Sequence, residues 1–196
     1  MALCLGFVLP DNFRFPYAAV GFSDFWKRWH ISLSSWLRDY LYIPLGGNRL
    51  GPGRTHVNLM ITMLLGGLWH GASWTFVVWG AMHGTYLVIE RLARQLAPPW
   101  RLWRTRPLQL LFGAATFVAV TLTWVVFRAK TFDRAVALWR SMAGASPAAT
   151  SLFRTQGQWG GQIKLVWLVV AGMLILHVVH RRRPLVDTVE RLPAVV

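Results

Sequence analysis

The sequence predicts an all-α, polytopic membrane protein, built from transmembrane and re-entrant helices with an interfacial amphipathic helix. Of its 196 residues, 55% are hydrophobic and 14% are charged, which is less charge than a soluble domain of this length carries. Twelve Trp and eleven Phe residues agree with this class, because aromatic rings collect at membrane–water interfaces. The basic residues stand in the gaps between long apolar runs, as they do in the loops of membrane proteins.

Residues 22–41 predict the amphipathic helix. Their aromatic and aliphatic side chains fall at helical spacing along one stripe, and the charged side chains lie largely off it. Ser23 is the expected N-cap, and Pro44 with the glycines that follow it ends the helix. His30 borders the apolar stripe, so we expect its side chain to face inward.

Residues 57–89 are uncharged apart from histidines, but they are too long for one ordinary crossing of a ~30 Å hydrocarbon core. Gly66, Gly67 and Gly71 interrupt the run near its middle, around His70. We therefore expect two helices, or a re-entrant pair, that meet at this interruption. Irregular backbone at membrane depth persists where protein or a water-filled cavity satisfies it, so His70 is expected to face a cavity.

Two further apolar runs, residues 108–127 and 163–179, predict transmembrane helices by their length and composition. Between them, residues 132–142 predict a short amphipathic helix, and residues 144–161 predict a loop rich in Gly, Ser, Pro and Ala. Basic clusters lie before the first run, at residues 91–106, and after the second, at residues 181–183, which favours a cytoplasmic location for both clusters. The basic residues of the loop between the two runs oppose this topology.

The charge and the cysteine content narrow the function classes. A net charge of +14 suits nucleic acid, anionic lipid or a phosphorylated ligand, but basic residues confined to loops disfavour nucleic acid. Cys4 is the single cysteine, so neither an intramolecular disulfide nor a multi-cysteine zinc site can form. The sequence has no His-Glu-x-x-His pattern, so we expect no metal site, and without a Gly-x-Ser-x-Gly elbow we reject a serine hydrolase.

Three histidines are candidates for chemistry. An ionisable side chain inside an apolar stretch is costly and marks a functional site by default. His70 fits two roles equally well: a general base that takes a proton from a hydroxyl, or a structural histidine bonded to a carbonyl across a helix interface. The sequence favours a polar interfacial role for His30, and for His83, which glycines flank, a packing role ahead of a cavity-lining one. The other histidines stand at the ends of apolar segments and are interpreted as interfacial: His56, His177 and His180.

Three blocks of sequence carry a resemblance to a known family. They are DFWKRWHISLSSWLRDYLYIPLGGNR at residues 24–49, GGLWHGASW at 66–74 and GAMHG at 80–84. In these blocks the chain resembles the membrane-bound O-acyltransferase family, in particular its bacterial alginate O-acetylation branch. The resemblance is densest over residues 16–91 and continues to about residue 183, which predicts that residues 1–183 form the C-terminal part of such a membrane domain and residues 184–196 a tail.

The resemblance implies a function and a site. His70 corresponds to the family's catalytic base, and His30 to the histidine that lines the same reaction tunnel, which Trp69, Trp74 and His83 would line as well. The donor is then acetyl-coenzyme A, bound transiently rather than as a permanent cofactor, and its acetyl group goes to a partner protein or an extracytoplasmic polysaccharide. The expected location is the bacterial inner membrane, crossed several times. The arginines expected to hold the coenzyme phosphates are Arg28, Arg38 and Arg49.

One departure from the family pattern concerns the start of the chain. Family members carry a large N-terminal half of further membrane helices, whereas this sequence begins almost directly in the shared block. The alternative to an enzyme is therefore a truncated, non-catalytic membrane scaffold that docks a partner of the acetylation machinery. A small transporter is a weaker alternative, because no inverted repeat is visible.

Overall fold

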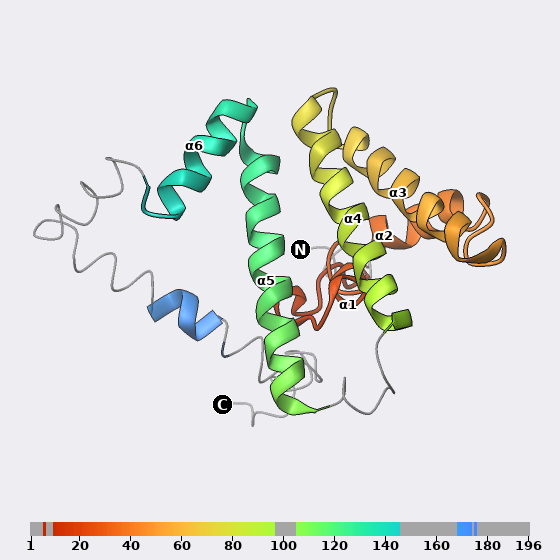
Figure 1. Cartoon of the computed structure of the whole chain (residues 1–196), viewed down its shortest axis with the longest axis horizontal. Helices are drawn as coiled ribbons and strands as arrows, with labels where there is room; N and C mark the ends of the chain where they lie inside the picture. Colours follow the sequence, from red (N-terminus) through yellow and green to blue (C-terminus); the bar gives the residue numbers. More distant parts are fainter. Residues whose placement is uncertain (1–5, 7–9, 97–104, 146–167, 174, 176–196) are drawn as a thin grey trace, which may run out of the picture.

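The computed structural model describes residues 6, 10–96, 105–145, 168–173 and 175 of the chain. Within these residues the secondary structure is helical throughout and contains no strand, which confirms the predicted all-α class for this part of the chain (Figure 1). In chain order the elements are η2 (Pro16–Ala18), α1 (Phe22–Trp26), α2 (Ile31–Leu37), η3 (Arg38–Tyr42), α3 (Gly51–Trp69), α4 (Trp74–Leu96), α5 (Arg106–Arg128) and α6 (Phe132–Met142).

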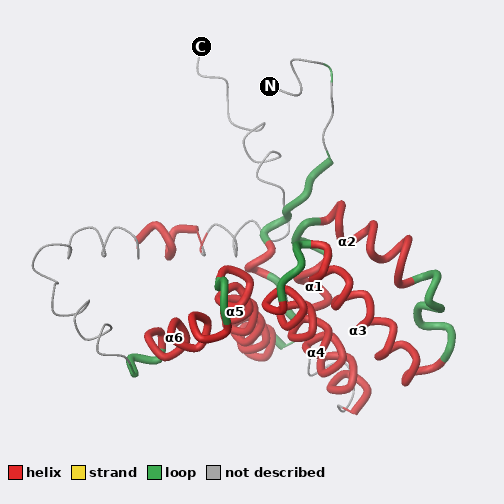
Figure 2. Tube along the Cα trace, turned by 90° about the horizontal axis from the view of Figure 1, so that it is seen from above, coloured by secondary structure: helices red, strands yellow, loops and turns green. Residues whose placement is uncertain are grey.

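The four longest of these helices follow one another in a row. Helix α3 packs against α4, α4 against α5, and α5 against α6, so neighbours in sequence are neighbours in space. Figure 2 shows α1 and α2 along one side of this row, and α1 packs on α4. Because α4 and α5 run in opposite directions, the start of α4 lies beside the end of α5 (Figure 1). At one end of the α4–α5 pair the start of α4 meets the end of α5, and at the other end the end of α4 meets the start of α5.

The prediction of a single helix over residues 22–41 is wrong. The chain forms α1 and α2 separately, then the π-helical turn η3, and His30 between α1 and α2 has left-handed backbone angles of φ 44° and ψ 56°. Asn12 accepts the backbone hydrogen bonds that the helix break leaves open. The Asn12 carbonyl oxygen accepts the Ile31 N–H at 2.9 Å, and Asn12 Oδ1 accepts the Ser32 N–H at 3.0 Å. A tertiary partner thus replaces the helical hydrogen bonds that periodicity predicts.

Two details of that predicted helix are wrong as well. The N-cap is Gly21, with φ 95°, and the Ser23 N–H instead donates to Glu90 Oε2 at 2.9 Å. The break rotates α2 relative to α1, so the apolar stripe does not stay on one buried side. Phe25 is 1% exposed, whereas Trp36 and Tyr40 further along the stripe are 52% and 70% exposed.

The predicted pair of helices in residues 57–89 is confirmed, with the break at the expected place. Helix α3 ends at Trp69, just before His70, and α4 begins at Trp74. Glycines let the two helices approach at backbone distance. A Cβ on Gly67 would overlap the Phe76 carbonyl oxygen, and one on Gly80 would overlap the Met63 carbonyl oxygen.

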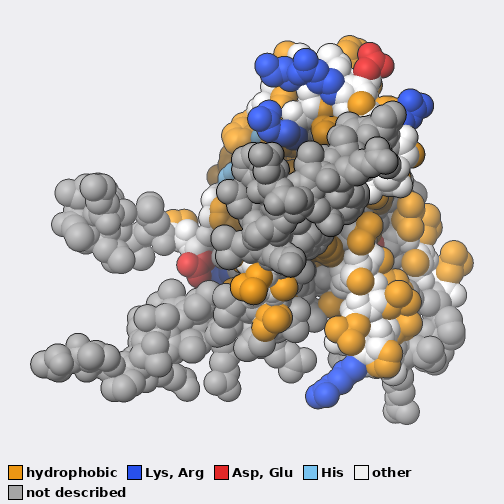
Figure 3. Space-filling model, turned by 90° about the vertical axis from the view of Figure 1, so that its left-hand side faces the viewer, with side chains coloured by type: hydrophobic (Ala, Val, Ile, Leu, Met, Phe, Trp, Pro, Cys, Tyr) orange, Lys and Arg blue, Asp and Glu red, His pale blue; other side chains and the backbone are white. Residues whose placement is uncertain are grey.

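Helix α5 confirms the helix predicted over residues 108–127. Among the described residues it is the one helix that is long and apolar enough to cross a membrane. Its residues Leu110, Leu111 and Val118 are exposed. Hydrophobic side chains also show on the face of the molecule drawn in Figure 3. Basic residues stand at both ends of α5, Arg106 and Arg128, as expected for a segment whose ends lie in the two interfaces.

The C-terminal predictions have mixed outcomes. The short amphipathic helix over residues 132–142 is confirmed as α6, and Trp139 Nε1 of that helix donates to the Leu122 carbonyl oxygen of α5 at 3.2 Å. Residues 168–173 and 175 are helical, but the rest of the predicted helix over residues 163–179 lies outside the described residues. Most of the predicted loop at residues 144–161 also lies outside them.

The core of the described residues lies where α1, α4 and α5 meet. Its largest members are aromatic: Phe25 and Trp26 of α1 pack near Trp79 of α4, and Val120 of α5 is fully buried. Removing a side chain of this size from water contributes about 1.5–3 kcal/mol, and aromatic pairs add about 0.5–1.5 kcal/mol. This core holds α1, α4 and α5 in fixed positions and so fixes what lies at the two ends of the α4–α5 pair.

Candidate functional site

His70 lies in the connection between α3 and α4, outside both helices. Its backbone N–H donates to the Gly67 carbonyl oxygen at 3.0 Å and closes the last turn of α3. Gly71 follows with φ 149°, in the region that favours glycine, and a Cβ there would also press on the Phe76 ring. The Trp-His-Gly sequence therefore reverses the chain with the imidazole held at the turn.

The His70 imidazole is surrounded by aromatic rings from three elements. Its ring centroid lies 5.3 Å from that of Trp79 in α4, 5.1 Å from that of Phe127 in α5 and 5.0 Å from that of Trp69 in α3. Burial lowers the pKa of His70 below its usual value, and the positive field of the nearby His30 lowers it further. At neutral pH the imidazole is therefore uncharged and able to accept a proton.

His30 approaches the same site from the break between α1 and α2. Its ring contacts Phe13 and Trp69, with centroid distances of 6.1 and 6.5 Å. The side chain is half-buried, and its Nδ1 is buried without a hydrogen-bond partner among the described residues. The expectation that His30 faces inward is confirmed in this sense. The structure thus places His30 and His70 both next to the Trp69 ring.

An open groove lies beside His30 and Trp69, and His70 is not among its lining residues. It has a volume of about 330 Å³, within the range of small-molecule sites. The groove is mainly apolar, with His30 and a serine hydroxyl as its polar groups. Its lining residues are His30, Ser32, Leu33, Trp36 and Trp69.

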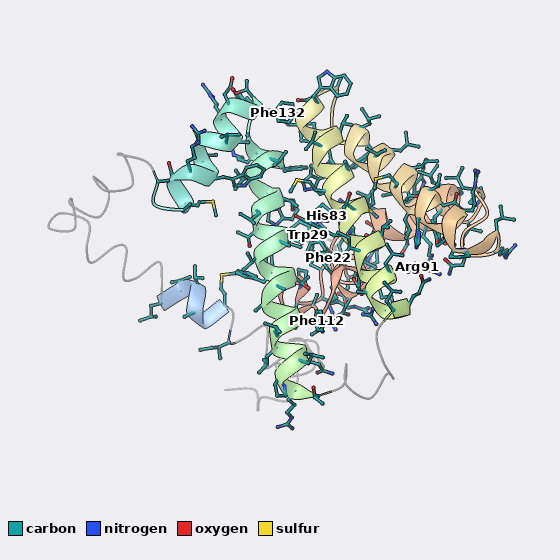
Figure 4. The ribbon with its side chains drawn as sticks, in the orientation of Figure 1. Phe22, Trp29, His83, Arg91, Phe112 and Phe132 are labelled. Atoms are coloured by element: carbon teal, nitrogen blue, oxygen red, sulfur yellow. The ribbon has the colours of Figure 1, made fainter. Side chains whose placement is uncertain are left out.

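His83 is in a different position from the other two histidines. It is fully buried between α4 and α5, and its Nε2 lies 3.1 Å from the hydroxyl of Thr123. Its ring packs against Trp26 and Trp79, at centroid distances of 5.2 and 4.7 Å. Figure 4 shows it at the middle of the α4–α5 pair, between the levels of Phe112 and Phe132. A bond across a helix interface of this kind matches the packing role.

Chemically, the site offers one neutral imidazole in an aromatic surround and a second imidazole next to it. A base of this kind can accept a proton from a hydroxyl. The described residues contain no cluster of three or more His, Cys, Asp or Glu side chains that could hold a metal ion.

Comparison with known proteins places these residues in a family. The model of the membrane-bound O-acyltransferase family matches residues 2–129, more than half of the chain. The chain belongs to this family. A probable alginate O-acetylase from Azotobacter vinelandii is 46% identical over 183 residues, which cover 91% of this chain and 33% of that protein.

Other relatives carry related names. A probable alginate O-acetylase from Pseudomonas aeruginosa is 48% identical over 142 residues, which cover 72% of this chain and 26% of that protein. A peptidoglycan O-acetyltransferase from Helicobacter pylori is 44% identical over 136 residues, or 69% of this chain and 25% of that protein. The chain spans a third or less of the length of these relatives. As a membrane-bound O-acyltransferase family member with an apolar helix α5, it is a membrane protein.

The arginines expected to bind coenzyme phosphates are spread from the end of α1 to the turn before α3. Arg28 Nε lies 2.8 Å from Asp24 Oδ1, in a half-buried ion pair. Arg38 forms an exposed pair with Asp39 at 2.7 Å, and its hydrogen bond lowers the pKa of that carboxyl. Arg49 is exposed in the turn before α3. Two of these arginines would therefore have to share or exchange their carboxylate partners to bind a phosphate.

The two tryptophans expected to line a tunnel stand on either side of the His70 turn. Trp69 is 60% exposed and borders the groove beside His30, and Trp74 is 75% exposed at the start of α4. The structure brings Trp69, His30 and His70 together, while His83 is fully buried among α1, α4 and α5. The tunnel itself stays a prediction.

Sequence reasoning missed two features of this chain. Phe127 of α5 closes the aromatic surround of His70, a contact between residues 57 positions apart that no local pattern indicates. At the other end of α4, Glu90 accepts the Ser23 N–H and forms an ion pair with Arg94 at 2.7 Å. The spacing of Glu90 and Arg94, four residues apart on a helix, was the available signal for that pair.

Proposed function

We propose that this chain provides the histidine site of a membrane O-acyltransferase. In this proposal the enzyme moves an acetyl group from acetyl-coenzyme A towards hydroxyls of an extracytoplasmic polysaccharide, or to a partner protein, in the bacterial inner membrane. His70 is the general base. The observation that carries the proposal is the half-buried His70, held among aromatic rings in the Trp-His-Gly turn of a chain that belongs to this family.

The chemistry assigns one step to His70. The imidazole accepts the proton of the acceptor hydroxyl as its oxygen attacks the thioester carbonyl. The carbon–sulfur bond then breaks, and the coenzyme thiolate leaves and takes up the proton from the imidazolium. An imidazole that starts uncharged suits this sequence, because a protonated one could not act as the base.

The proposal that acetyl is the transferred group and a glycan the acceptor rests on the names of the relatives. Two of them are named alginate O-acetylases and one a peptidoglycan O-acetyltransferase, so both names combine acetyl transfer with a cell-surface polysaccharide. A teichoic acid D-alanyltransferase from Streptococcus thermophilus is 37% identical over 93 residues, which cover 44% of this chain and 22% of that protein. The higher identity and longer coverage favour acetyl over D-alanyl as the transferred group.

Neighbouring residues would position the reactants. His30 lines the groove, and its Nδ1 has no hydrogen-bond partner among the described residues, so in this proposal the imidazole holds an oxygen of the acceptor or the thioester. Trp69 would separate the two imidazoles from solvent. Trp74 and His83 are proposed to line the reaction tunnel together with Trp69. Arg28, Arg38 and Arg49 are proposed to hold the coenzyme phosphates by charge-assisted hydrogen bonds.

The test uses a chimaera. This chain replaces the matching third of the Azotobacter vinelandii relative, and membranes containing the chimaera receive labelled acetyl-coenzyme A and alginate. We expect label in the polysaccharide, and a loss on the order of 10²–10⁴-fold in the His70→Ala variant, as for removal of a general base. Membrane insertion should be the same for both proteins.

The matched control is His56→Ala, which removes a half-buried histidine near the start of α3, far along the helix from His70. This variant should transfer acetyl at the rate of the unsubstituted chimaera. Retained transfer by His70→Ala would refute the role of His70. Absence of transfer from a chimaera that inserts normally would contradict the proposal that this chain supplies an acyltransferase site.

A further inference from the structure

Two adjoining hollows lie at the end of the α4–α5 pair that is remote from His70. The larger, about 410 Å³, lies between the end of α4, the start of α5 and the residues that lead into α1. The smaller, about 280 Å³, lies between α1 and α4. Glu90 and Arg94 line both hollows, so the two share a wall. Together they form a site with an apolar part and a charged part.

The larger hollow is apolar over most of its surface. Aromatic and aliphatic side chains form most of it. Its polar side chains are Glu90 and Arg94, on the wall shared with the smaller hollow, and Gln109 and Thr116 of α5. Leu110 and Leu111, next in sequence to its lining residues Gln109 and Phe112, are exposed. The apolar lining residues are Val20, Phe22, Ile89, Ala93, Phe112 and Ala115.

The smaller hollow carries an excess of positive charge. Its two carboxylates are already paired, Asp24 with Arg28 and Glu90 with Arg94. Lys27 and Arg91 also line it, and neither forms an ion pair with a carboxylate of the described residues. Arg91 Nε is in addition buried without a hydrogen-bond partner in this part of the structure. A buried, unpaired guanidinium nitrogen is costly, and an anion would satisfy it.

The position along the helices fits an interface between membrane and water. Phe76, beside His70, and Glu90 are 14 residues apart on α4, which is about 21 Å at 1.5 Å per residue. Arg106 marks the start of α5 at this end, so the apolar span of α5 begins next to the charged hollow. Figure 4 shows Phe22, Arg91 and Phe112 at this end of the α4–α5 pair.

We propose that the two hollows bind one anionic phospholipid, with an acyl chain in the apolar hollow and the headgroup phosphate at Lys27 and Arg91. Charge complementarity supports a phosphate at the unpaired cations, and basic pockets between membrane helices bind anionic headgroups. The apolar hollow that continues from this charged site favours a lipid over a soluble phosphate. The site is separate from the groove beside His30 and uses none of its lining residues.

The test measures lipid binding by the purified full chain in neutral detergent, with no acyl donor present, so its result is independent of transferase activity. Phosphatidylglycerol and phosphatidylcholine with the same acyl chains are added in turn, and bound lipid is counted by native mass spectrometry. We expect phosphatidylglycerol to bind at least about tenfold more tightly, which corresponds to 1.4 kcal/mol. Inorganic phosphate and glycerophosphoglycerol, which lack acyl chains, should compete weakly.

Variants assign the binding to the site. Arg91→Gln and Lys27→Gln should each remove most of the preference for phosphatidylglycerol, and Ala93→Phe, which fills the apolar hollow, should weaken both lipids. The matched controls are Lys130→Gln and Arg134→Gln, exposed basic residues at the other end of α5 and on α6. These should bind phosphatidylglycerol like the unsubstituted chain.

Three results would overturn the proposal. Equal binding of the two phospholipids would remove the role of the headgroup charge. Competition by inorganic phosphate or glycerophosphoglycerol as strong as that by the intact lipid would identify a soluble-phosphate site instead. An equal loss in Lys130→Gln and Arg91→Gln would show that the attraction comes from overall basic charge and not from these hollows.

Discussion

The two ends of the α4–α5 pair are built in opposite ways. At the His70 end, uncharged aromatic rings surround an imidazole, and glycines bring α3 and α4 to backbone contact. At the Glu90 end, the Ser23 N–H donates to Glu90 and joins α1 to α4, and Glu90 also forms an ion pair with Arg94 within α4. The Gly21 N–H donates to Thr116 Oγ1 at 3.0 Å and joins the start of α1 to α5. At the first end uncharged rings surround the imidazole, which suits a neutral base, while the second gathers charged side chains and suits an anion.

This contrast separates the chain's two proposed tasks. Burial among aromatic rings lowers the pKa of His70, and a cluster of cations close by would lower it further and make the imidazole a weaker base. Arg91 lies 15 residues along α4 from Phe76, which contacts His70, and this separation of about 22 Å keeps its charge away from the His70 imidazole. The predictions below test each end, from the largest expected effect to the smallest.

The largest expected effect on stability is at the His70 end. Gly67→Ala places a Cβ against the Phe76 carbonyl oxygen, which is backbone and cannot move without separating α3 from α4. We expect a loss of about 3 kcal/mol or more in the free energy of unfolding, measured by thermal unfolding in detergent. Gly84→Ala is the matched control, because its closest obstacle is the flexible Met60 sulfur, and it should cost about 1 kcal/mol. Equal losses in the two variants would contradict backbone-limited packing at Gly67.

At the Glu90 end the sensitive glycine is Gly21. Its backbone, with φ 95° and ψ 162°, lies in a region that is essentially restricted to glycine, and a Cβ would overlap the Glu90 carboxylate. Gly21→Ala should therefore lower the free energy of unfolding by about 2 kcal/mol. Gly144→Ala, also at positive φ but in open space, is the control that isolates the backbone cost. A Gly21 variant no worse than Gly144→Ala would mean that Glu90 moves aside freely.

The same carboxylate gives a smaller, salt-dependent effect. Glu90→Gln keeps an oxygen to accept the Ser23 N–H but loses the charge that pairs with Arg94. The Glu90 side chain is 12% exposed and that of Arg94 39%, so solvent partly screens the pair and we expect a loss of about 1 kcal/mol. Unfolding measured at low and high salt should show the difference between the variant and the unsubstituted chain shrinking as salt rises. A difference independent of salt would point to packing rather than charge.

The two ends of the α4–α5 pair also differ in how well their structure could be predicted from the sequence. The His70 end could be predicted, because the glycines, the histidine and the adjacent tryptophan are consecutive residues whose local pattern implies a helix break. The Glu90 end could not, because its hydrogen bonds join residues 67 and 95 positions apart, such as Ser23 with Glu90 and Gly21 with Thr116. The helix predicted over residues 22–41 failed for a related reason. Its periodicity is intact, but Asn12, ten or more residues upstream, supplies the hydrogen bonds that allow the break at His30.

The smallest expected effect concerns the coupling of the two histidines at the His70 end. Burial is the main cause of the lowered pKa of His70, and the charge of His30 is the second. Transfer by the chimaera should therefore stay high at neutral pH and fall as the pH drops through this lowered pKa, because protonation removes the base. His30→Asn removes the second cause, so the pKa of His70 rises and the acid limb of the pH–rate profile moves to higher pH.

Asparagine is the suitable replacement because it tolerates the left-handed backbone that His30 adopts, so the break between α1 and α2 can persist. The measurement is the midpoint of the acid limb of kcat/KM for acetyl transfer, with His56→Asn as the control that leaves the midpoint in place. A midpoint that does not move in His30→Asn would show that the two imidazoles titrate independently. A rise in the midpoint would show that His30 helps to keep His70 uncharged, and that the aromatic surround is not the sole cause.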